Sequence, residues 1–456
     1  MKRKNTIITL LIGLCLFSIA LLAFASCNES TSTGSYKENK KTESLGLEYI
    51  LNNDQSSYSV VSVGTCQDTD IVIPSKHEEK PITAILANAF NGYTALTNIT
   101  IPESVTSIGE DAFYDTAYYN NEENWENGVL YIGKYLIRAK TSISGVYTIK
   151  DGTQSLASSA FYECDNLTKI TIPQSVTTIG SGAFWKCKKL EQIDMPSNLT
   201  CIESWTFYQC DNLSNIVIPD SVTSIGSSAF AYCKKIKTVQ MGEGITSIGS
   251  QAFYECNSLQ SITIPNSVQK IANEVFWNCS SLERIDIGSG VTSISTEAFY
   301  NCIALKGVYI TDIVAWCNIS FRGSSCNPLS CTTNLYLNKE LITQLVIPET
   351  VEMINAYAFF NSQMITSVII PSSVKIIDHD AFLHCSNLEN VYYAGTVEDW
   401  AKIKIGIMNQ PFMNATRYYY SENEPVLNTD GTAYDENYWH YDVDGTTPVA
   451  WIYKKD

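Results

Sequence analysis

Residues 167–187 read Leu167-Thr168-Lys169-Ile170-Thr171-Ile172-Pro173-Gln174-Ser175-Val176-Thr177-Thr178-Ile179-Gly180-Ser181-Gly182-Ala183-Phe184-Trp185-Lys186-Cys187, and this pattern returns every 23 residues. Two columns keep the period without a gap. They contain Phe161, Phe184, Phe207, Phe230, Phe253, Phe276 and Phe299, and Cys164, Cys187, Cys210, Cys233, Cys256, Cys279 and Cys302. A fixed period between about 20 and 50 residues is the signature of a solenoid, in which each repeat forms one coil.

The residue types within one repeat predict the shape of a coil. Ile170 and Ile172 alternate with polar residues, so both point into the core of a short strand. Pro173 ends that strand because it has no N–H to donate. Ala183-Phe184 then fills the coil from a 3₁₀ or single α-helical turn on the opposite wall. We therefore predict a solenoid of stacked coils with a parallel β-sheet of short strands, helical turns on the opposite wall, and β-hairpin caps and insertions.

Two interruptions divide the predicted solenoid, which spans residues 70–390. Phe113 and Phe161 are one period plus 25 residues apart, and the extra residues 118–144 predict a hairpin that leaves the solenoid. Residues 308–338 form the second interruption, and they resemble residues 391–420 in their Val-Tyr, Trp and Pro positions. We interpret both segments as local caps or flaps, each anchored by its tryptophan, with residues 391–420 as a C-terminal module.

The ends of the chain differ from the repeats. Residues 1–27 combine a basic start, an apolar run and Phe24-Ala25-Ser26-Cys27, which predicts a lipoprotein signal peptide with Cys27 as the lipid anchor. A plain signal peptide or an uncleaved span is the alternative. Residues 28–45 predict a flexible polar tether, residues 46–69 a capping hairpin, and residues 421–456 an acidic, irregular tail.

The charge and the polar residues restrict the classes of function. A formal net charge of −17 over 456 residues excludes a basic surface for nucleic acid. The four histidines form no pair with metal-ligand spacing, and Asp378-His379-Asp380 is interpreted as a polar turn. The sequence therefore predicts no enzyme activity, no metal and no cofactor.

The cysteine column is interpreted as a ladder of buried thiols. Its spacing lacks the close pairs of a metal site. Equivalent Cβ atoms in stacked coils lie as far apart as the strands, about 4.8 Å, which exceeds the roughly 3.8 Å that a disulfide prefers. A disulfide remains an alternative for the insertion, which contains Cys317, Cys326 and Cys331.

The columns resemble the BspA-type leucine-rich repeat of bacterial surface proteins. The matching residues are the Leu-x-x-Ile-x-Ile-Pro strand, the corner Ser221-Val222-Thr223-Ser224-Ile225-Gly226 and the plug Ala229-Phe230-Ala231-Tyr232-Cys233. The resemblance implies a leucine-rich-repeat solenoid. It also implies a surface location and an adhesin role, because the family includes adhesins that bind host matrix and plasma proteins. It carries over no catalytic residue.

Two strips of the predicted coils are candidate binding surfaces. The first contains outward strand residues, which vary from coil to coil: Lys169, Gln192, Asp194, Asn215, Gln240 and Arg284. The second contains the aromatic residue that follows the plug phenylalanine: Trp185, Tyr208, Tyr254, Trp277 and Tyr300. Each strip has a structural alternative, a solvated sheet face for the first and a ladder of rings stacked on each other for the second.

The sequence therefore favours an exported, lipid-anchored or secreted binding protein of the bacterial cell surface. The expected partner is a protein or glycan on a host or neighbouring cell, and an adhesin that binds a protein is the first hypothesis. The alternatives are a glycan-binding lipoprotein that uses the aromatic strip, and a non-catalytic structural spacer.

Overall fold

The computed structural model describes residues 42–453, and residues 43–453 belong to one compact unit. The expected signal peptide, Cys27 and most of the tether lie outside the described residues. Within residues 42–453, no helix is both long enough and apolar enough to span a membrane.

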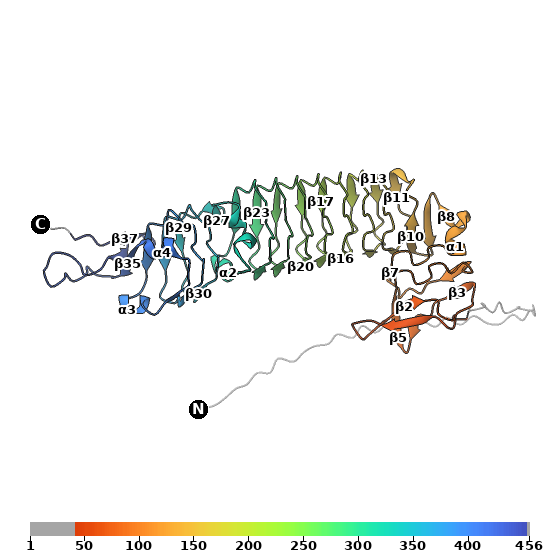
Figure 1. Ribbon diagram of the computed structural model, residues 1–456, viewed down its shortest axis with the longest axis horizontal. Helices are drawn as coiled ribbons and strands as arrows, with labels where there is room; N and C mark the ends of the chain where they lie inside the picture. Colours follow the sequence, from red (N-terminus) through yellow and green to blue (C-terminus); the bar gives the residue numbers. More distant parts are fainter. Residues whose placement is uncertain (1–41, 454–456) are drawn as a thin grey trace, which may run out of the picture. The chain divides into compact units, whose positions relative to one another are not determined.

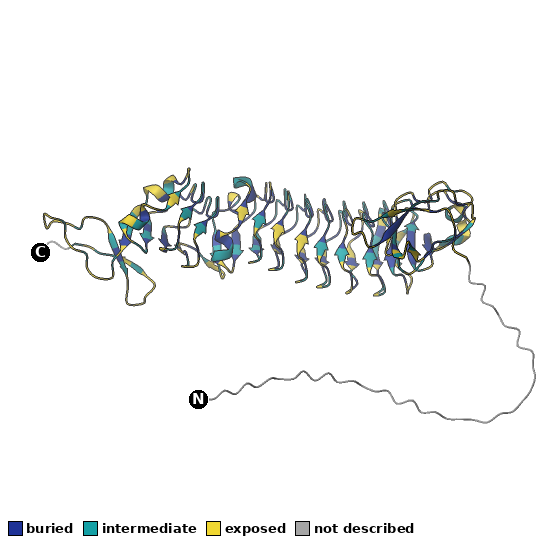
Figure 2. Cartoon of the chain, turned by 90° about the horizontal axis from the view of Figure 1, so that it is seen from below, coloured by how far each residue is buried: buried dark blue, intermediate teal, exposed yellow. Residues whose placement is uncertain are grey.

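The central coils stack through a parallel sheet, as predicted (Figure 1). In a three-residue strand the middle side chain is buried and its neighbours are exposed, so Ile193, Ile216 and Ile262 face the core. The strands of this face are β11 (Ser144–Thr148), β13 (Asn166–Thr171), β15 (Gln192–Asp194), β17 (Asn215–Val217), β19 (Thr238–Gln240), β21 (Ser261–Thr263), β23 (Arg284–Ile287), β25 (Gly307–Ile310) and β27 (Leu335–Leu337). Figure 2 shows buried residues continuing from coil to coil.

A second row of two-residue strands forms the next side of each coil. They are β12 (Ser155–Leu156), β14 (Thr178–Ile179), β16 (Cys201–Ile202), β18 (Ser224–Ile225), β20 (Ser247–Ile248), β22 (Lys270–Ile271), β24 (Ser293–Ile294) and β26 (Ser320–Phe321). Glycine follows several of these strands because the backbones approach closely. A Cβ on Gly180 would lie 2.4 Å from the Ser158 nitrogen of the preceding coil.

The opposite wall is a stack of phenylalanine rings. From Phe161 to Phe299 the centroids of neighbouring rings lie 5.2–5.6 Å apart and the ring planes differ by 1–16°. Backbone hydrogen bonds join the turns of successive coils, for example from Phe184 N to Thr206 O at 2.8 Å. Each buried phenylalanine contributes roughly 1.5–3 kcal/mol of hydrophobic stabilisation.

The cysteine column forms the predicted ladder of buried thiols. From Cys187 to Cys302 each sulfur donates to the carbonyl of a phenylalanine in the preceding coil, as Cys187 Sγ does to Phe161 O at 3.1 Å and Cys256 Sγ to Phe230 O at 3.2 Å, whereas Cys164 Sγ donates to Lys140 O at 3.6 Å. Every described cysteine is a free thiol, including Cys317, Cys326 and Cys331, so the structure does not contain the alternative disulfide.

Stability should fall as the pH rises above about 8.5, because buried thiols resist ionisation. Burial raises the pKa of Cys164 and Cys385 to about 12 and raises the pKa of Cys210 and Cys256 well above the ordinary value. Thiols of the unfolded chain ionise near pH 8.5. Above this pH the unfolded state binds fewer protons than the folded state, so the free energy of unfolding falls as the pH rises. We expect urea midpoints to be level from pH 7 to about pH 8 and to decrease by about pH 9.5. Midpoints that stay constant over this range would contradict the ladder of neutral thiols.

The first insertion belongs to the solenoid, so the prediction of a hairpin that leaves it is wrong. β9 (Val129–Ile132) and β10 (Tyr135–Ala139) do form an antiparallel hairpin. However, β10 pairs in parallel with β12, and both hairpin strands are largely buried. The hairpin therefore extends the row of corner strands. The same insertion contains α1 (Ala117–Asn120) and β8 (Trp125–Glu126).

The second insertion and its C-terminal counterpart are complete coils, which corrects their interpretation as caps or flaps. In the insertion, α2 (Ile313–Cys317) lies in the chain between β25 and β26. β25 pairs with β23 and β26 pairs with β24 of the preceding coil, and β27 then pairs with β25. Trp316 is 1% exposed and donates through Nε1 to Ala358 O at 2.7 Å. Trp316 is therefore part of the shared core. The insertion ends with the hairpin strand β28 (Glu340–Leu341).

The C-terminal counterpart repeats this arrangement. Its elements are β33 (Asn390–Tyr393), α3 (Val397–Trp400), β34 (Lys404–Ile405), α4 (Gln410–Asn414) and β35 (Thr416–Tyr420). It follows two regular coils with β29 (Gln344–Val346), β30 (Met353–Ile354), β31 (Ser367–Ile370) and β32 (Ile376–Ile377). The ring of Phe412 stacks on Phe382 at 4.8 Å, so this coil continues the phenylalanine wall.

Both ends of the described chain add strands to the stack. The first coils contain β3 (Asp70–Val72), β4 (Lys76–His77), β5 (Lys80–Ile85), β6 (Asn98–Thr100) and β7 (Ser107–Ile108). The capping segment forms the hairpin of β1 (Glu48–Leu51) and β2 (Tyr58–Ser62), and β2 pairs with β5.

The tail is not irregular throughout, contrary to the prediction. β36 (Tyr438–Tyr441) pairs in parallel with β35, and β37 (Pro448–Ala450) returns antiparallel to β36. Trp439 is fully buried, and its Nε1 donates to Tyr393 O at 2.9 Å. The buried Trp439 and the pairing of β36 with β35 therefore attach the tail to the last coil.

Candidate binding face

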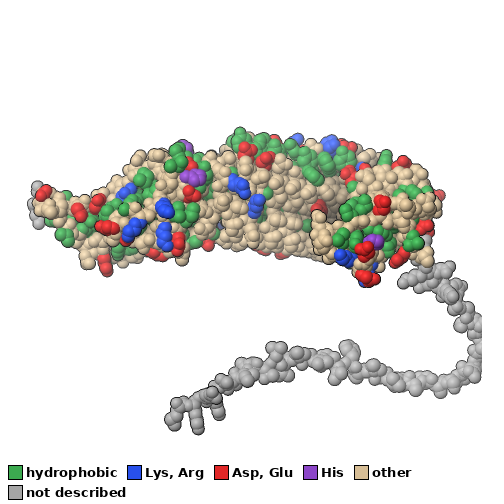
Figure 3. Space-filling model, turned by 60° about the horizontal axis from the view of Figure 1, so that its bottom comes forward, with side chains coloured by type: hydrophobic (Ala, Val, Ile, Leu, Met, Phe, Trp, Pro, Cys, Tyr) green, Lys and Arg blue, Asp and Glu red, His purple; other side chains and the backbone are tan. Residues whose placement is uncertain are grey.

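The first predicted strip lies on the outer side of the parallel sheet. Gln192, Asp194, Asn215 and Gln240 are exposed, while Lys169 and Arg284 are half-buried. The strand register brings them into two columns, with Lys169 opposite Gln192 and Val217 opposite Gln240. The strip therefore lies at accessible positions on the outer side of the sheet. Figure 3 shows another view of the surface, in which uncharged polar side chains and backbone cover most of the central coils.

The strand ladder of this face is interrupted between β15 and β17. β15 pairs with β13 and β17 pairs with β19, but in the described part of the chain no strand pairing joins β15 to β17. The corner strands β14 and β16 are likewise unpaired with each other. The turns of the same two coils remain bonded, with Gly182 N donating to Ser204 O at 3.0 Å. The two coils therefore separate on the sheet side and stay joined on the phenylalanine wall.

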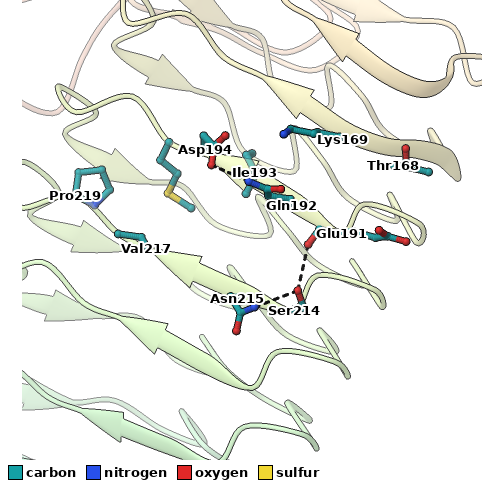
Figure 4. A pocket seen from close by; sticks show the side chains of 11 residues that line it. Thr168, Lys169, Glu191, Gln192, Ile193, Asp194, Ser214, Asn215, Val217 and Pro219 are labelled. Carbon is teal, nitrogen blue, oxygen red and sulfur yellow. Dashed lines mark hydrogen bonds between the residues drawn. The ribbon is translucent and has the colours of Figure 1, made fainter.

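A groove of about 630 Å³ lies at this interruption (Figure 4). Its lining includes Lys169, Gln192, Asp194, Asn215 and Val217, so it contains most of the first strip. Few bonds cross it. Ser214 Oγ lies 3.5 Å from Glu191 O, whereas Gln192 Nε2 donates to Asp194 Oδ1 within its own strand at 3.2 Å. The facing strand edges leave backbone N–H and C=O groups available to a ligand.

One sequence feature coincides with the interruption. Glu203 stands at the corner position that Gly180, Gly226 and Gly249 occupy in other central coils. A Cβ on these glycines would lie 2.4–2.6 Å from a backbone nitrogen of the preceding coil. Glu203 has such a Cβ, but Ala272 and Ser295 have one at the same corner position and their strands β22 and β24 still pair with the preceding coil, so the Cβ alone does not explain the interruption.

A charged and aromatic cluster lies further along the same face. Arg284 donates to both carboxylate oxygens of Asp286, from Nε at 2.7 Å and from a terminal nitrogen at 2.6 Å. Its guanidinium carbon lies 3.7 Å from the ring centroid of Tyr309. The hydrogen bonds to Asp286 raise the pKa of Arg284 above its ordinary value. Both contacts fix the orientation of the guanidinium.

Two stacked tyrosines complete this cluster, which we call the Arg284 cluster (Arg284, Asp286, Tyr309 and Tyr336). The rings of Tyr309 and Tyr336 are nearly parallel, with centroids 4.4 Å apart. Gly307 gives them room, because a Cβ there would lie 2.6 Å from Tyr336 Cε2. A groove of about 440 Å³ adjoins the cluster, and its lining includes Asp286 and Tyr309 together with Asn338 and Lys339.

Sequence reasoning found Arg284 but missed the two tyrosines as site residues. Tyr309 pairs with Asp286, and Tyr336 pairs with Tyr309. Both tyrosines therefore continue the outward column that contains Asp194, Val217 and Asp286. The signal was present in the sequence, but it lay inside a segment that was interpreted as a flap.

The rings of the second predicted strip contact each other in a ladder, in which Tyr254, Trp277 and Tyr300 stack face to face and the earlier contacts are edge-on or tilted. Successive ring centroids from Tyr162 to Tyr300 lie 4.6–5.7 Å apart, and most of the rings are half-buried. Tyr232, one position later than expected, supplies the ring that Ala231 lacks. The rings of Trp185, Tyr208, Tyr254 and Trp277 contact rings of the ladder on both sides, so each is packed between two neighbouring coils.

The described residues contain no group of three or more His, Cys, Asp or Glu side chains arranged to hold a metal ion. His379 and Asp380 form a local contact of 2.7 Å from Nδ1 to Oδ2, at a turn where Asp380 has φ of 59°. This contact fits the interpretation of Asp378-His379-Asp380 as a polar turn.

A family model described as the BspA type leucine rich repeat region matches residues 64–147, 131–233, 200–327 and 330–402 in six copies. The chain belongs to the BspA-type leucine-rich-repeat family. The matches cover most of the coils described above, including both coils that contain a buried tryptophan. A search of the curated proteins found no match.

BspA-type repeats have relatives among solved structures. A leucine-rich repeat protein from Bacteroides ovatus is 21% identical, with 82% of this chain and 98% of that chain covered and a TM-score of 0.41. A leucine-rich cell surface protein from Faecalibacterium prausnitzii is 22% identical, with 80% of this chain and 98% of that chain covered and a TM-score of 0.26. The pneumococcal vaccine antigen PcpA is 17% identical, with 76% of this chain and 82% of that chain covered and a TM-score of 0.27.

Proposed function

We propose that this chain is a surface-anchored, non-catalytic binding protein, an adhesin that engages a protein on a host or neighbouring cell. The observation that carries the proposal is the Arg284 cluster on the open strand face. Arginine and tyrosine are enriched among the residues that dominate protein interfaces. Here the guanidinium and both rings are held in place before any partner arrives, which lowers the entropic cost of binding.

The surroundings of the cluster also suit a protein partner. The groove beside it has backbone and uncharged polar groups in its lining together with Lys339 and Asp286, so it offers hydrogen bonds and both charges. The face continues along β21, β19 and β17 to the groove at the interruption. A partner that contacts both grooves would bury a row of exposed, varied side chains. Export and lipid anchoring through Cys27 form part of the same proposal.

The proposal is tested by binding to immobilised collagen, laminin and mucin at physiological salt. We expect saturable binding to one of these proteins. Tyr309→Ala and Arg284→Ala should each weaken that binding by at least about tenfold, because hot-spot residues contribute roughly 2 kcal/mol or more. The measurement is surface interferometry with the purified protein.

Lys234→Ala is the matched control, because it also removes one positive charge. Lys234 is exposed and its ion pair with Asp211 measures 3.6 Å, so its loss should leave both fold and binding unchanged. Equal loss of binding in Lys234→Ala and Arg284→Ala would show a general charge effect. That result, or retained binding in Tyr309→Ala, would contradict the assignment of this face.

A further inference from the structure

The aromatic ladder lacks one ring where the second insertion begins. The turn hydrogen bond from Cys302 N to Phe299 O has its counterpart in the next coil, from Cys331 N to Pro328 O. Pro328 is therefore equivalent to Phe299, and Leu329 is equivalent to Tyr300. Leu329 is fully buried and contributes no ring. Phe360 supplies an aromatic residue at this position only one coil later. Tyr300 is therefore the last ring of an uninterrupted stack.

Tyr300 presents one face of its ring to this missing position. On the side of the preceding coil, Trp277 stacks on Tyr300 with centroids 5.7 Å apart and planes differing by 19°. On the side of the next coil, a pocket of about 500 Å³ is lined by Tyr300 and by the turn residues Ser324, Ser325 and Ser330. Tyr300 is 49% exposed. The pocket volume lies within the range of about 300–1,000 Å³ that is typical of ligand sites.

The lining of this pocket combines one open aromatic face with several small polar groups. Ser324, Ser325 and Ser330 each carry a hydroxyl that donates and accepts, and Asn301 carries an amide. Ile303, 73% exposed, adds an apolar edge. None of the described residues that line the pocket carries a charge. An occupant should therefore be uncharged, flat enough to stack on Tyr300, and rich in hydroxyl groups.

We propose that this pocket binds a single pyranose ring of a neutral glycan, which takes the place of the missing ring on the face of Tyr300. The apolar C–H face of the sugar would lie on Tyr300, and its hydroxyls would bond to the serine hydroxyls and the Asn301 amide. An aromatic side chain of a peptide would also stack, but it would offer no hydrogen-bonding groups to the serine hydroxyls or to the Asn301 amide oxygen, whose Nδ2 already donates to Asn278 Oδ1. The site is separate from the Arg284 cluster and does not depend on the proposed protein partner.

The test is isothermal titration of the full chain with maltopentaose, cellopentaose, mannopentaose and chitopentaose, each up to about 10 mM. We expect saturable binding of at least one sugar. Tyr300→Ala should weaken it at least about tenfold, since the stacking surface is lost. Ser330→Trp should weaken it equally, because an indole at this position fills the pocket. The second variant keeps Tyr300 in place and so separates loss of the site from loss of folding.

Tyr114→Ala is the matched control. Tyr114 follows the plug residue Phe113 in an early coil, is 48% exposed and lies against Tyr119, with no part in this pocket. Its replacement should leave sugar binding unchanged. Absence of binding to all four sugars, or binding that survives both Tyr300→Ala and Ser330→Trp, would overturn the proposal. Binding of the peptide Gly-Phe-Gly in place of every sugar, lost in Tyr300→Ala, would also overturn it and assign the pocket to a peptide.

Discussion

Replacing Phe253 with alanine should lower the free energy of unfolding by about 3–5 kcal/mol. Phe253 is fully buried, and its ring stacks between Phe230 at 5.3 Å and Phe276 at 5.6 Å. The backbone hydrogen bonds from Phe253 N to Val275 O at 2.9 Å and from Phe230 N to Ala252 O at 2.8 Å hold the coils at a fixed spacing. The cavity therefore cannot close, which places the expected cost in the upper part of the range for large-to-small changes.

Urea unfolding followed by circular dichroism measures this effect. Val146→Ala is the control, because Val146 also lies on a strand but is 67% exposed, and its replacement should change stability by no more than about 0.5 kcal/mol. Since each coil contacts only its neighbours, we also expect the loss of Phe253 to divide unfolding into two steps. A single transition with an unchanged midpoint would contradict the role of the ring stack.

The regular coils were predictable because each residue type meets the same surroundings once per period. An isoleucine or valine of the strand faces the core in every central coil, and from Cys187 to Cys302 each cysteine meets the equivalent phenylalanine carbonyl, so the columns alone specify burial and register. Phe184 and Cys187 could be placed in this way. The aromatic strip was predicted with both of its alternatives, and the structure shows a continuous ladder of ring contacts because Tyr232 closes the gap left by Ala231.

The non-periodic segments were not predictable by the same reasoning. The hairpin of β9 and β10 was recognised from the sequence. Its parallel pairing with β12 was not, because the hairpin lies outside the 23-residue repeat and the repeat does not show which strand it joins. Tyr309 and Tyr336 were overlooked for the same reason. The interruption between β15 and β17 has a different cause. The core columns continue through Ile193 and Ile216, and the separation depends on small differences in how closely two backbones approach.

These two kinds of segment have different roles in the candidate function. The periodic columns form the core, and their outward residues vary from coil to coil. Two of the distinctive surface features lie at the second insertion, where the period is interrupted. The Arg284 cluster borders the second insertion, and the pocket at Tyr300 exists because the same insertion supplies no ring. Binding residues in such a solenoid are therefore best sought at the insertions, where neighbouring coils differ most.

Replacing Trp316 with alanine tests whether the second insertion is a coil of the core. We expect the free energy of unfolding to fall by at least about 3–5 kcal/mol, because a buried indole leaves a large cavity and Ala358 O loses a hydrogen bond of 2.7 Å. The effect should reach the coils on both sides, since β25 pairs with β23 and Ala358 belongs to the following coil. The measurements are urea unfolding and amide hydrogen exchange.

Trp205→Ala is the control, since it removes the same side chain from the surface. Trp205 is 44% exposed and its ring lies 6.4 Å from Trp185, so its loss should cost no more than about 1 kcal/mol. Faster exchange in Trp316→Ala should appear at Phe359 and Leu345 as well as within residues 308–338. Exchange limited to residues 308–338, with an unchanged urea midpoint, would mean that the insertion is a local flap, as the sequence pattern alone suggested.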